Sequence, residues 1–595
     1  MASSTQPKKF INDPSEAVSE FIEGLLLQYP NRIRKLQNHN VLLSSDINYD
    51  KVNILSGGGS GHEPSHAGWI ASKGMLTGAI LGGIFASPSV SSILAAIRAV
   101  TQVRSGKGCL LIVKNYTGDR LNFGMACELA NAEGRKCQMV VVADDAALER
   151  SKGVTGARGV AGTVFVHKVA GAAAQMGLSL EEVAEAASHV SEKISSLGVA
   201  LDAVTIPGAT SINNRLDGST IEIGLGIHGE AGIRQSEMQS ADELAEIMVT
   251  TILEYGLIEK SSGEVIPTFN NGDQLAIMVN NLGGVSNFEM SILANSVVKV
   301  LEGKYNSTVK RLYVGGFMTS FNMQGASISI ISMTNASDVT GKYLDAETDA
   351  LSWVKADNWI INGSARPSQI EVPEITVTKS DNVSYEKVTV EIENFSERSK
   401  AMVKSACALL IESEPTLTKY DTIVGDGDCG ITMKRGAKEI ISRLENEQLN
   451  SNHPVALFES LASAVSASMG GTSGILLELM FRKMSTFLNN EEVSIDESCL
   501  IRAFEEGVNA VSFYGGATEG SRTMLDALYP AVKKLKSGDT LEVAAQASMA
   551  GANETAEMGS ASAGRSNYLN EDVLTGTPDP GAIAVALALK AIVTK

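Results

Sequence analysis

Hydrophobic and polar residues follow two different patterns along this chain of 595 residues. From about residue 15 to 345, short uncharged apolar runs alternate with stretches in which apolar residues recur at every third or fourth position. Runs of the first kind are typical of buried strands, and the second spacing is typical of helices that cover a sheet. Strands are predicted at 108–113, 138–143, 274–279 and 310–314, and helices at 89–103 and 121–132. We therefore expect an α/β domain with a mostly parallel sheet and a second α/β lobe.

The pattern changes near residue 365. Residues 365–390 form an extended stretch rich in Thr, Val and Ser, with Pro367 and Pro373 and little helical periodicity, as expected of a linker. Beyond residue 391 almost every segment has helical periodicity. Helices are predicted at 395–413, 431–444, 456–468, 474–488, 495–511, 523–535, 540–561 and 582–593. The chain is therefore predicted to contain an α/β domain (1–364), a linker (365–390) and an all-α domain (391–595).

Composition narrows the class of protein. A hydrophobic content of 44% with 20% charged residues is that of a globular protein with an ample core. The net charge of −19 argues against binding to nucleic acids or to anionic membranes. The uncharged segment 74–97 is long enough to span a bilayer, but its Pro88, serines and glycines favour a strand, loop and helix. Six scattered cysteines without a CxxC pair, and no apolar signal at the N-terminus, favour a cytoplasmic location.

Three carboxylates lie close together in the helical part of the sequence. Asp421, Asp426 and Asp428 are spaced by glycines, among them Gly425 and Gly427, that allow the chain to fold back tightly before a helix. Several hard oxygen ligands in a small volume suit Mg²⁺, whose other ligands are commonly waters and phosphates. A solvated Asp-Gly turn is the alternative. A calcium loop is not supported, because the required Glu at its twelfth position is absent.

A phosphate site is also indicated, although a Walker A loop is absent. The glycine-rich segment 470–474 and the segment 579–581 stand where helices are predicted to begin, and free N–H groups at a helix start bind phosphate. Arg565 lies nearby in a loop and can pair with phosphate in a bidentate way. Ordinary helix caps would give the same pattern at either helix start.

Two glycine-framed histidines stand out in the α/β part. His62 ends the segment 56–62, which follows an apolar strand and brings backbone N–H groups near a small polar ligand. His228 lies in 224–229, which matches GxGxxG. A dinucleotide site is rejected there, because the motif lies deep in the domain rather than in its first βα unit. Lys114 and Asp119 follow a strand, where open α/β sheets bind ligands.

Together and in this order, these motifs resemble the ATP-dependent dihydroxyacetone (glycerone) kinase family. The resemblance covers nearly the whole chain, through GGGSGHEPSHAGW, VKNYTGDRLNFGMA, GLGIHGE, GDGDCG, SMGGTSG and GRSNYLNEDVLTGTPDPGA. It implies an α/β domain that binds dihydroxyacetone and an all-α helical barrel that binds ATP. It also implies a homodimer in which the helical domain of one subunit serves the active site of another.

The resemblance assigns roles by matching position. Dihydroxyacetone is expected as a hemiaminal on His228, with His62 in proton transfer and two Mg²⁺ ions on Asp421, Asp426 and Asp428. Substrate contacts are expected at Gly59, Ser60, Gly61, His62, Lys114 and Asp119. Nucleotide contacts are expected at Cys429, Gly430, Ile431, Thr432, Met433, Thr472, Ser473, Gly520, Arg565, Asp579, Pro580 and Gly581. Some relatives carry His in place of Cys429, so the contribution of this side chain is left open.

Several functional alternatives remain at this point. Glyceraldehyde or 3,4-dihydroxy-2-butanone are plausible further substrates, and some members of the family also split FAD into cyclic FMN and AMP. A phosphotransferase-system enzyme that keeps ADP as a fixed cofactor is disfavoured by the fusion of both domains. A non-catalytic ketone-binding regulator is disfavoured because it needs neither a nucleophile nor a metal site. The remaining histidines are expected to be structural or exposed: His39, His66, His167, His189 and His453.

Overall fold

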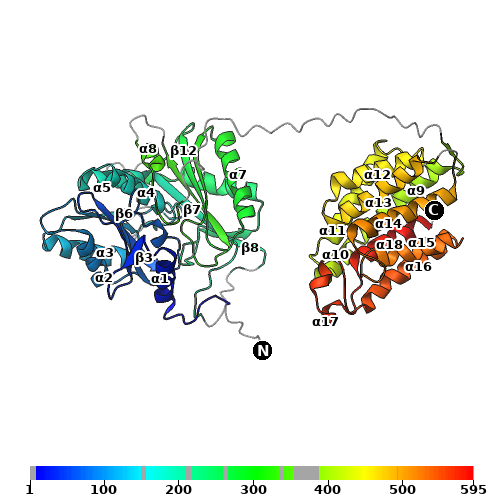
Figure 1. Ribbon diagram of the computed structural model, residues 1–595. Helices are drawn as coiled ribbons and strands as arrows, with labels where there is room; N and C mark the ends of the chain where they lie inside the picture. The colour runs from blue at the N-terminus through cyan, green and yellow to red at the C-terminus, as the bar shows by residue number, and fades with distance from the viewer. Residues whose placement is uncertain are drawn as a thin grey trace. The chain divides into compact units, whose positions relative to one another are not determined.

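The computed structural model describes residues 8–148, 156–209, 216, 218–258, 265–333, 339–353, 388–491 and 494–593. The chain divides into two compact units, Met1–Ile370 and Glu371–Lys595, each of which is described by itself (Figure 1). Most of the predicted linker lies outside the described residues.

The first unit begins with a six-stranded sheet, in the order β1-β2-β4-β3-β5-β6. Strands β4, β3, β5 and β6 are parallel to one another, and β1 and β2 add an antiparallel edge. The predicted parallel sheet is thus present. The strands are β1 (Ile33–Lys35), β2 (Val41–Ser44), β3 (Asn53–Ser60), β4 (Gly78–Ile84), β5 (Cys109–Lys114) and β6 (Cys137–Val142).

A second six-stranded sheet, in the order β13-β12-β14-β7-β8-β9, forms the second lobe. Only β12 and β13 are parallel, so this lobe departs from the mostly parallel arrangement. Its strands are β7 (Ile194–Ala200), β8 (Thr220–Ile223), β9 (Arg234–Glu237), β12 (Gln274–Asn281), β13 (Thr308–Gly315) and β14 (Gly325–Ser332). A separate antiparallel pair joins β10 (Gly256–Ile258) and β11 (Val265–Pro267).

Helices cover these sheets and fill the space between them. Helix α4 is buried along almost its whole length, since most of its residues are apolar or small; His167 and Lys168 are buried with them. Its core cluster contains Ile112 of the first sheet and Met278 of the second, so one core joins the two lobes. The helices are α1 (Ala17–Gln28), α2 (Val90–Val100), α3 (Thr117–Ala132), α4 (Thr163–Gln175), α5 (Leu180–Lys193), α6 (Ala241–Glu254), α7 (Asn287–Lys304) and α8 (Thr340–Asp345).

The uncharged segment 74–97 forms strand β4 and most of helix α2, as predicted. Among the described residues, no helix is both long enough and apolar enough to cross a membrane.

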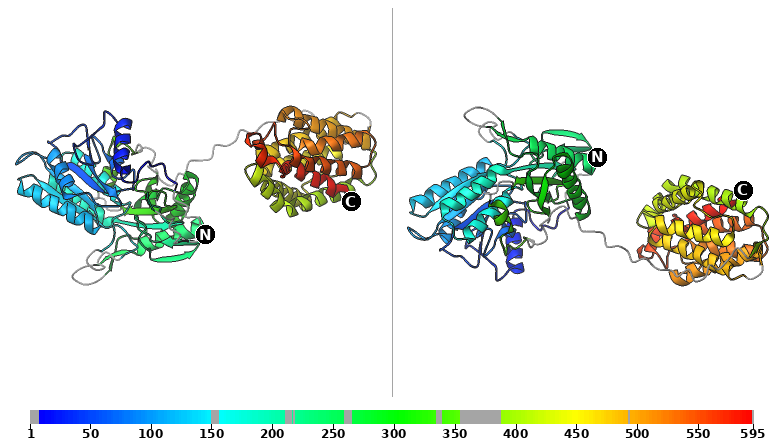
Figure 2. Two further views of the ribbon diagram at one scale, coloured as in Figure 1. Left: turned by 90° about the horizontal axis from the view of Figure 1, so that it is seen from below. Right: turned by 90° about the horizontal axis from the view of Figure 1, so that it is seen from above.

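The second unit is helical, as predicted (Figure 2). Helices α9, α11, α12, α13, α14, α15, α16 and α18 each pack against the next, and α18 packs against α9, which closes a barrel. A cavity of about 580 Å³ with mainly apolar walls lies among these helices. The helices are α9 (Phe395–Glu412), α10 (Glu414–Val424), α11 (Cys429–Glu445), α12 (Pro454–Ser468), α13 (Gly471–Asn489), α14 (Glu497–Gly515), α15 (Leu525–Lys536), α16 (Leu541–Glu554), α17 (Glu571–Leu574) and α18 (Pro580–Val593).

Two details of this unit were predicted wrongly. Helix α10 was not foreseen; Ser413 joins it to α9, and it buries Leu417 and Val424. Helix α16 ends at Glu554, before the predicted 561, because the chain tightens there into a 3₁₀ turn, Thr555–Glu557.

Candidate active site

The glycine-rich segment after the first apolar run is not a loop, because β3 continues through Ser60. A Cβ atom at Gly59 would lie 2.7 Å from backbone atoms of Phe85 and Ala86. Glycine therefore allows the strand to lie unusually close to the segment that follows β4. Ser60 donates a hydrogen bond to the carbonyl of Gly82 at 2.8 Å, which fixes the end of the strand.

Gly58 makes room for a cluster of functional side chains. A Cβ atom there would lie 2.6 Å from Nζ of Lys114, 3.4 Å from Oδ2 of Asp119 and 3.5 Å from Cε1 of His66. Lys114 ends β5 and Asp119 stands in the first turn of α3, so both come from the carboxyl end of a parallel strand. The structure thus brings Lys114 and Asp119 together beside the glycine strand.

His62 is fully buried, and its hydrogen bonding fixes its tautomer. Its Nδ1 lies 2.9 Å from the carbonyl oxygen of Thr319, so Nδ1 carries the proton and donates. Burial and the nearby charges of Lys114 and His228 hold the pKa of His62 well below 6.5. Its Nε2 has no hydrogen-bond partner among the described residues. This nitrogen is therefore an unprotonated acceptor.

His228 comes from the second sheet, in the turn between β8 and β9. Its Nδ1 donates to Oε1 of Glu230 at 2.8 Å, and its backbone N–H donates to Oε2 at 2.9 Å. Burial alone would raise the pKa of Glu230, but the hydrogen bonds that His228 donates outweigh it and hold the pKa at about 2. The Nδ1–H···carboxylate bond leaves Nε2 of His228 as the nitrogen with a free lone pair.

Aromatic contacts bring the two predicted histidines together. The ring centroids of His62 and His228 are 4.9 Å apart, and the ring of Phe85 stacks on His62 and meets the edge of His228. Tyr116 adds another edge contact to His228, at 4.7 Å. These contacts hold the His62 ring, which follows a strand of the first sheet, beside the His228 ring, which follows a strand of the second.

His66 also lies in this site, although it was expected to be structural or exposed. Its ring is buried, and its centroid lies 5.8 Å from that of His167 on helix α4, which is also buried. His167 lies a hundred positions away in the sequence. The available signal was the spacing of His62 and His66 in a single glycine-rich motif.

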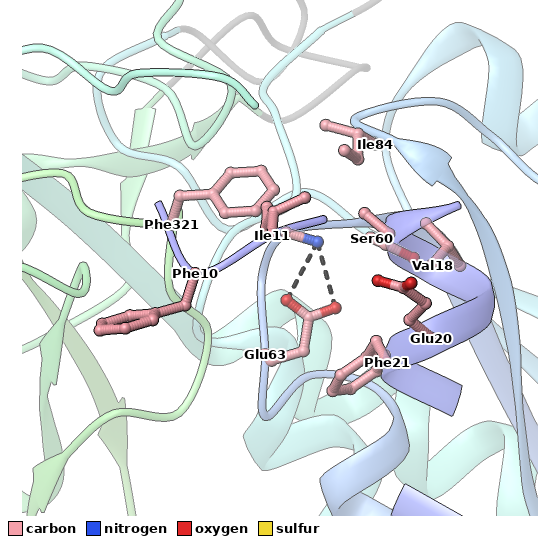
Figure 3. Close-up of a pocket in the computed structure, with 11 residues that line it drawn as sticks. Phe10, Ile11, Val18, Glu20, Phe21, Ser60, Glu63, Ile84 and Phe321 are labelled. Carbon is pink, nitrogen blue, oxygen red and sulfur yellow. Dashed lines mark hydrogen bonds between the residues drawn. The ribbon is translucent and has the colours of Figure 1, made fainter. Parts of the chain in front are cut away.

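A cavity of about 370 Å³ borders the same strand (Figure 3). The N-terminal residues, helix α1, Gly61 and Phe321 line it, while His62 and His228 are not among its lining residues. The Glu63 carboxylate turns back and accepts the Gly61 N–H at 3.0 and 3.1 Å. Burial raises the pKa of this carboxyl group. The backbone N–H of Gly61 is thus already used by Glu63.

In the helical unit the three predicted carboxylates converge. Each of Asp421, Asp426 and Asp428 offers an oxygen that lies within 4.8 Å of the others. Asp421 stands in the last turn of α10, and its Oδ2 accepts the backbone N–H groups of Asp428 and Cys429 at 2.8 and 2.9 Å. A Cβ atom at Gly425 would collide with Oδ1 of Asp421, so the turn requires glycine there.

The charges around this trio suit a cation and a phosphate. Burial and the charges of Asp426 and Asp421 raise the pKa of Asp428, and the positive charges of Arg565 and Arg435 offset only part of this effect. Arg565 forms an exposed ion pair with Asp426 at 2.9 Å. The donor set, three carboxylates on one tight turn, fits hard divalent cations such as Mg²⁺.

The predicted helix starts are present. Helix α13 begins at Gly471, beside Thr472 and Ser473, and α18 begins at Pro580, next to Gly581. Asp579 caps α18, since its Oδ1 accepts the Ala582 N–H at 2.7 Å, and burial raises its pKa to about 6.

Other predicted nucleotide residues stand in varied settings. Thr432 and Met433 are buried, so a ligand could reach only their backbone, whereas Ile431 is half exposed. Burial raises the pKa of the Cys429 thiol, which keeps it protonated. Gly430 lies against α10, where a Cβ atom would collide with the Glu414 carbonyl and Thr418. Gly520 occupies a turn and donates its N–H to Asp526.

Comparison with known proteins gives the family. Residues 23–352 match the Dak1 domain, and residues 423–594 match the DAK2 domain. The α/β unit and the helical barrel thus correspond to the two parts of a known class of two-domain proteins. The chain belongs to the dihydroxyacetone kinase family.

Relatives match along the full length. A putative 3,4-dihydroxy-2-butanone kinase of Solanum lycopersicum is 41% identical, over 98% of this chain and 97% of the relative. The triokinase/FMN cyclase of Homo sapiens is 38% identical, over 98% of each chain. The crystal structure of the Citrobacter freundii dihydroxyacetone kinase in complex with AMP-PNP and Mg²⁺ matches with a TM-score of 0.62 and 33% identity, over 99% of this chain and 100% of that chain.

Proposed function

We propose that this protein is an ATP-dependent kinase that phosphorylates dihydroxyacetone. The observation that carries the proposal is the setting of His228, whose Nδ1 is held by Glu230 while its ring makes T-shaped contacts with the rings of His62 and Phe85. An imidazole held in this way is a nucleophile for a carbonyl carbon. Family membership supports the reaction class, because relatives along the full length carry the names dihydroxyacetone kinase and triokinase.

The ketone is captured as a hemiaminal. Nε2 of His228 forms a bond to the carbonyl carbon, the π electron pair of the carbonyl moves to the ketone oxygen, and this oxygen takes up a proton from solvent water. The Nδ1 proton of His228 shifts toward Glu230, whose carboxylate stabilises the positive charge that develops on the ring. A covalent bond also explains how a very small ketone, with little area to bury, is selected over alcohols of the same size.

His62 acts on the reacting hydroxyl group. Its Nε2 is buried, unprotonated and close to His228, so it can accept the proton of the hydroxyl as phosphate is transferred. Lys114 and Asp119, together with the end of β3 at Gly59, Ser60 and Gly61, orient the hydroxyl groups of the ketone.

The helical unit holds the nucleotide. We propose that Asp421, Asp426 and Asp428 hold two Mg²⁺ ions, which when bound supply charge neutralisation for the phosphates of ATP. Arg565 pairs with phosphate, and the N-terminus of α13 at Thr472 and Ser473 offers free backbone donors. The remaining nucleotide contacts are proposed at the predicted positions near Cys429, Gly520 and Asp579.

The test is phosphorylation of dihydroxyacetone by MgATP, measured as ADP formation. The wild-type protein is expected to turn over, whereas His228→Ala and Asp426→Ala are each expected to lose most of the activity. Glyceraldehyde and 3,4-dihydroxy-2-butanone would be compared as acceptors in the same assay. Absence of turnover with all three acceptors would refute the proposal. Activity only with an added phosphocarrier mixture would indicate the phosphotransferase type instead.

A second activity is favoured by the relatives that carry the name triokinase/FMN cyclase. We propose that the same carboxylate trio could serve cleavage of FAD to cyclic FMN and AMP. Chromatography of FAD incubated with a divalent cation would detect the product. This activity should be lost in Asp426→Ala and retained in His228→Ala, because it needs no ketone.

A non-catalytic role is less well supported. A dihydroxyacetone kinase operon co-activator is 32% identical over 58% of this chain, with a TM-score of 0.51. A regulator that only binds a ketone would not need the carboxylate trio that this chain carries. Turnover in the kinase assay would exclude a purely regulatory role.

We also propose a homodimer in the reducing environment of the cytoplasm, with the helical unit of one subunit serving the ketone site of the other.

A further inference from the structure

Four buried polar atoms around Lys114 lack hydrogen-bond partners in the described part of the chain. They are Nζ of Lys114, both ring nitrogens of His66, and Nδ1 of His167. Burying a polar atom without a hydrogen-bond partner costs free energy. Four such atoms in one place therefore require an arrangement that gives each of them a partner.

At the Ser56 end of this group, the donor and the acceptor of each hydrogen bond can be assigned. The Ser56 hydroxyl donates to the carbonyl of Ile112 at 2.7 Å, and this uses its only hydrogen. Nε2 of His167 lies 3.0 Å from the same hydroxyl oxygen, so this nitrogen must be the donor. A neutral His167 then has an unprotonated Nδ1, and burial keeps the ring neutral by lowering its pKa to about 3.

His66 lies between His167 and Lys114. Its centroid is 5.8 Å from the His167 ring, and its Cε1 and the Lys114 Nζ both lie within 3.5 Å of the space left by the missing side chain of Gly58. His66 is neutral as well, because burial and the Lys114 charge hold its pKa well below 6.5. A neutral imidazole has one donor and one acceptor, and so can join a donor on one side to an acceptor on the other.

We propose that Lys114, His66, His167 and Ser56 form a one-way hydrogen-bond chain that positions the Lys114 ammonium group for the ketone. Lys114 donates to His66, His66 donates to the Nδ1 of His167, His167 donates to Ser56, and Ser56 donates to the Ile112 carbonyl. The first two links each run through one bridging water, and they satisfy all four unpartnered atoms. The chain ends on β5, the strand that carries Lys114, so it braces the lysine against its own strand.

This inference rests on the proposed kinase function for its consequence. One N–H of Lys114 is held by His66 and another faces Asp119, which leaves the third for an oxygen of the ketone. His66 and His167 are therefore positioning residues, which act through Lys114 without touching the substrate. The titratable groups that act on the His66 ring are Lys114, His167 and His62, and the carboxylates of Asp119 and Glu63 act on Lys114.

The kinetic test uses His66→Phe, which keeps a ring but removes both nitrogens. We expect kcat/KM for dihydroxyacetone to fall about tenfold or more, the scale of one misplaced hydrogen bond to a charged group, with KM for ATP unchanged. His66→Gln, which keeps a donor and an acceptor, should recover most of the loss. In a Lys114→Met background, His66→Phe should add less than about a twofold further loss, because the group it positions is gone.

Two results would refute the proposed hydrogen-bond chain. One is an equal effect of His66→Phe in the presence and absence of Lys114. The other is a His66→Gln variant as impaired as His66→Phe at an unchanged melting temperature. His39→Phe is the control, since His39 bonds Ser92 outside this cluster and should remain within about twofold of wild type.

A second measurement needs neither variants nor turnover, so it separates failure of the chain from failure of the kinase proposal. Nitrogen-15 NMR of labelled histidine in the full chain should show His66 and His167 neutral from pH 5.5 to 8, with the His167 proton on Nε2. A doubly protonated ring in that range, or a proton on Nδ1 of His167, would refute the proposed direction of the chain.

Discussion

Glu230 shows how much of the ketone site depends on a single side chain. It accepts two hydrogen bonds from His228, one from the ring and one from the backbone, and its low pKa keeps it ionised at every pH at which the protein would work. In the proposed reaction, the carboxylate both selects the tautomer of His228 and balances the charge that would form when Nε2 attacks a carbonyl.

Glu230→Gln should therefore lower kcat/KM for dihydroxyacetone by about a hundredfold, because the amide keeps the shape but carries no charge. Carbon-13 NMR of dihydroxyacetone labelled at the carbonyl carbon would test the cause. The wild-type complex should show the resonance of a saturated carbon, and the variant should show mainly free ketone. Glu237→Gln, on exposed strand β9, is the matched control. A normal hemiaminal signal in Glu230→Gln would contradict this account.

His167 makes a prediction about stability against pH. The unfolded ring takes up a proton as the pH falls below about 6.5, whereas the folded ring stays neutral until about pH 3. Since the unfolded state binds more protons in this window, the stability contributed by the neutral ring is lost as the pH falls.

Relative to His167→Gln, wild-type protein should therefore lose about 1.4 kcal/mol of unfolding free energy per pH unit below 6.5. Urea unfolding of both proteins at pH 7 and pH 5.5, followed through the transition of the α/β unit, measures the difference. An equal response of the two proteins would show that His167 is protonated in the folded state.

At the scale of single residues, the sequence predicts which residues are functional candidates better than it predicts which side chains lie next to one another. His62 and His228 could be proposed because each stands in a glycine-rich motif, and their rings do lie 4.9 Å apart. His66 could not be placed, because its surroundings depend on the missing side chain of Gly58 and on a histidine of helix α4. Contacts between distant segments are fixed by packing and leave no local signal.

Among the elements, the turn between α10 and α11 carries the metal proposal. Gly425 has a negative φ (−150°), and the requirement for glycine that the structure shows is one of space. The added methyl group of Gly425→Ala would displace the Asp421 carboxylate, which in turn holds the N–H groups at the start of α11.

We expect Gly425→Ala to weaken binding of Mg²⁺ with a non-hydrolysable ATP analogue at least tenfold, by about 1.4 kcal/mol or more, while dihydroxyacetone binding is unchanged. Isothermal titration calorimetry would measure both. Gly303→Ala on α7, where a Cβ atom meets nothing within 4 Å, is the control and should bind normally. Unchanged nucleotide affinity in Gly425→Ala would argue against the carboxylate trio as the metal site.

Arg522 is the second element-scale feature, since its buried guanidinium joins several segments of the barrel end. It donates to the carbonyls of Leu574 and Thr577 and to the hydroxyl of Ser566, and Ser566 in turn donates to the carbonyl of Val424. The turn that precedes α15 is thereby linked to the segment that holds Arg565 and to the end of α10.

Arg522→Met would leave buried carbonyl groups unpartnered, at about 1–3 kcal/mol each, so the helical unit should unfold at a clearly lower temperature. Its nucleotide affinity should fall as well, because Arg565 is the neighbour of Ser566 and would be displaced when that segment loosens. Calorimetric unfolding with and without nucleotide checks both effects. Arg502→Met is the matched control: Arg502 pairs with Glu491 near the surface and should cost about 1 kcal/mol or less.

Element types were largely predictable, and their ends were not. Periodicity identified the helices that close the barrel. It did not identify α10, whose eleven residues are separated from α9 by Ser413 alone. Strand β3 was predicted too short because glycine normally ends a strand, whereas here Gly57 and Gly59 allow close packing against neighbouring backbone. The antiparallel second sheet could not be inferred, since strand direction depends on connections that the apolar pattern does not record.

At the scale of the whole molecule, the proposed chemistry is divided between two units. The nucleophile His228 belongs to the α/β unit, and the carboxylate that Asp426 contributes belongs to the helical unit. Transfer of a phosphoryl group requires the two reacting groups to meet in one site. Whether that site is assembled within one chain or between two chains determines the activity of a dimer that contains two differently defective subunits.

Two defective chains distinguish these assemblies. His228→Ala has an intact nucleotide site, and Asp426→Ala has an intact ketone site. Co-expression with two different tags, followed by purification on both, isolates heterodimers. If the helical unit of one subunit serves the ketone site of the other, each heterodimer contains one fully intact site and one that is doubly defective, so it should have about half of the wild-type activity per dimer.

If each chain instead completes its own site, both sites of the heterodimer contain one lesion, and activity should remain at the level of the two parent variants. The readout is ADP formation from dihydroxyacetone and MgATP, and wild-type chains carrying the same two tags provide the reference. The two arrangements predict different activities, because neither parent variant carries the missing group within its own chain. Recovery of activity therefore requires a site built from two subunits, whereas its absence in a purified heterodimer would contradict domain exchange and leave the kinase proposal intact.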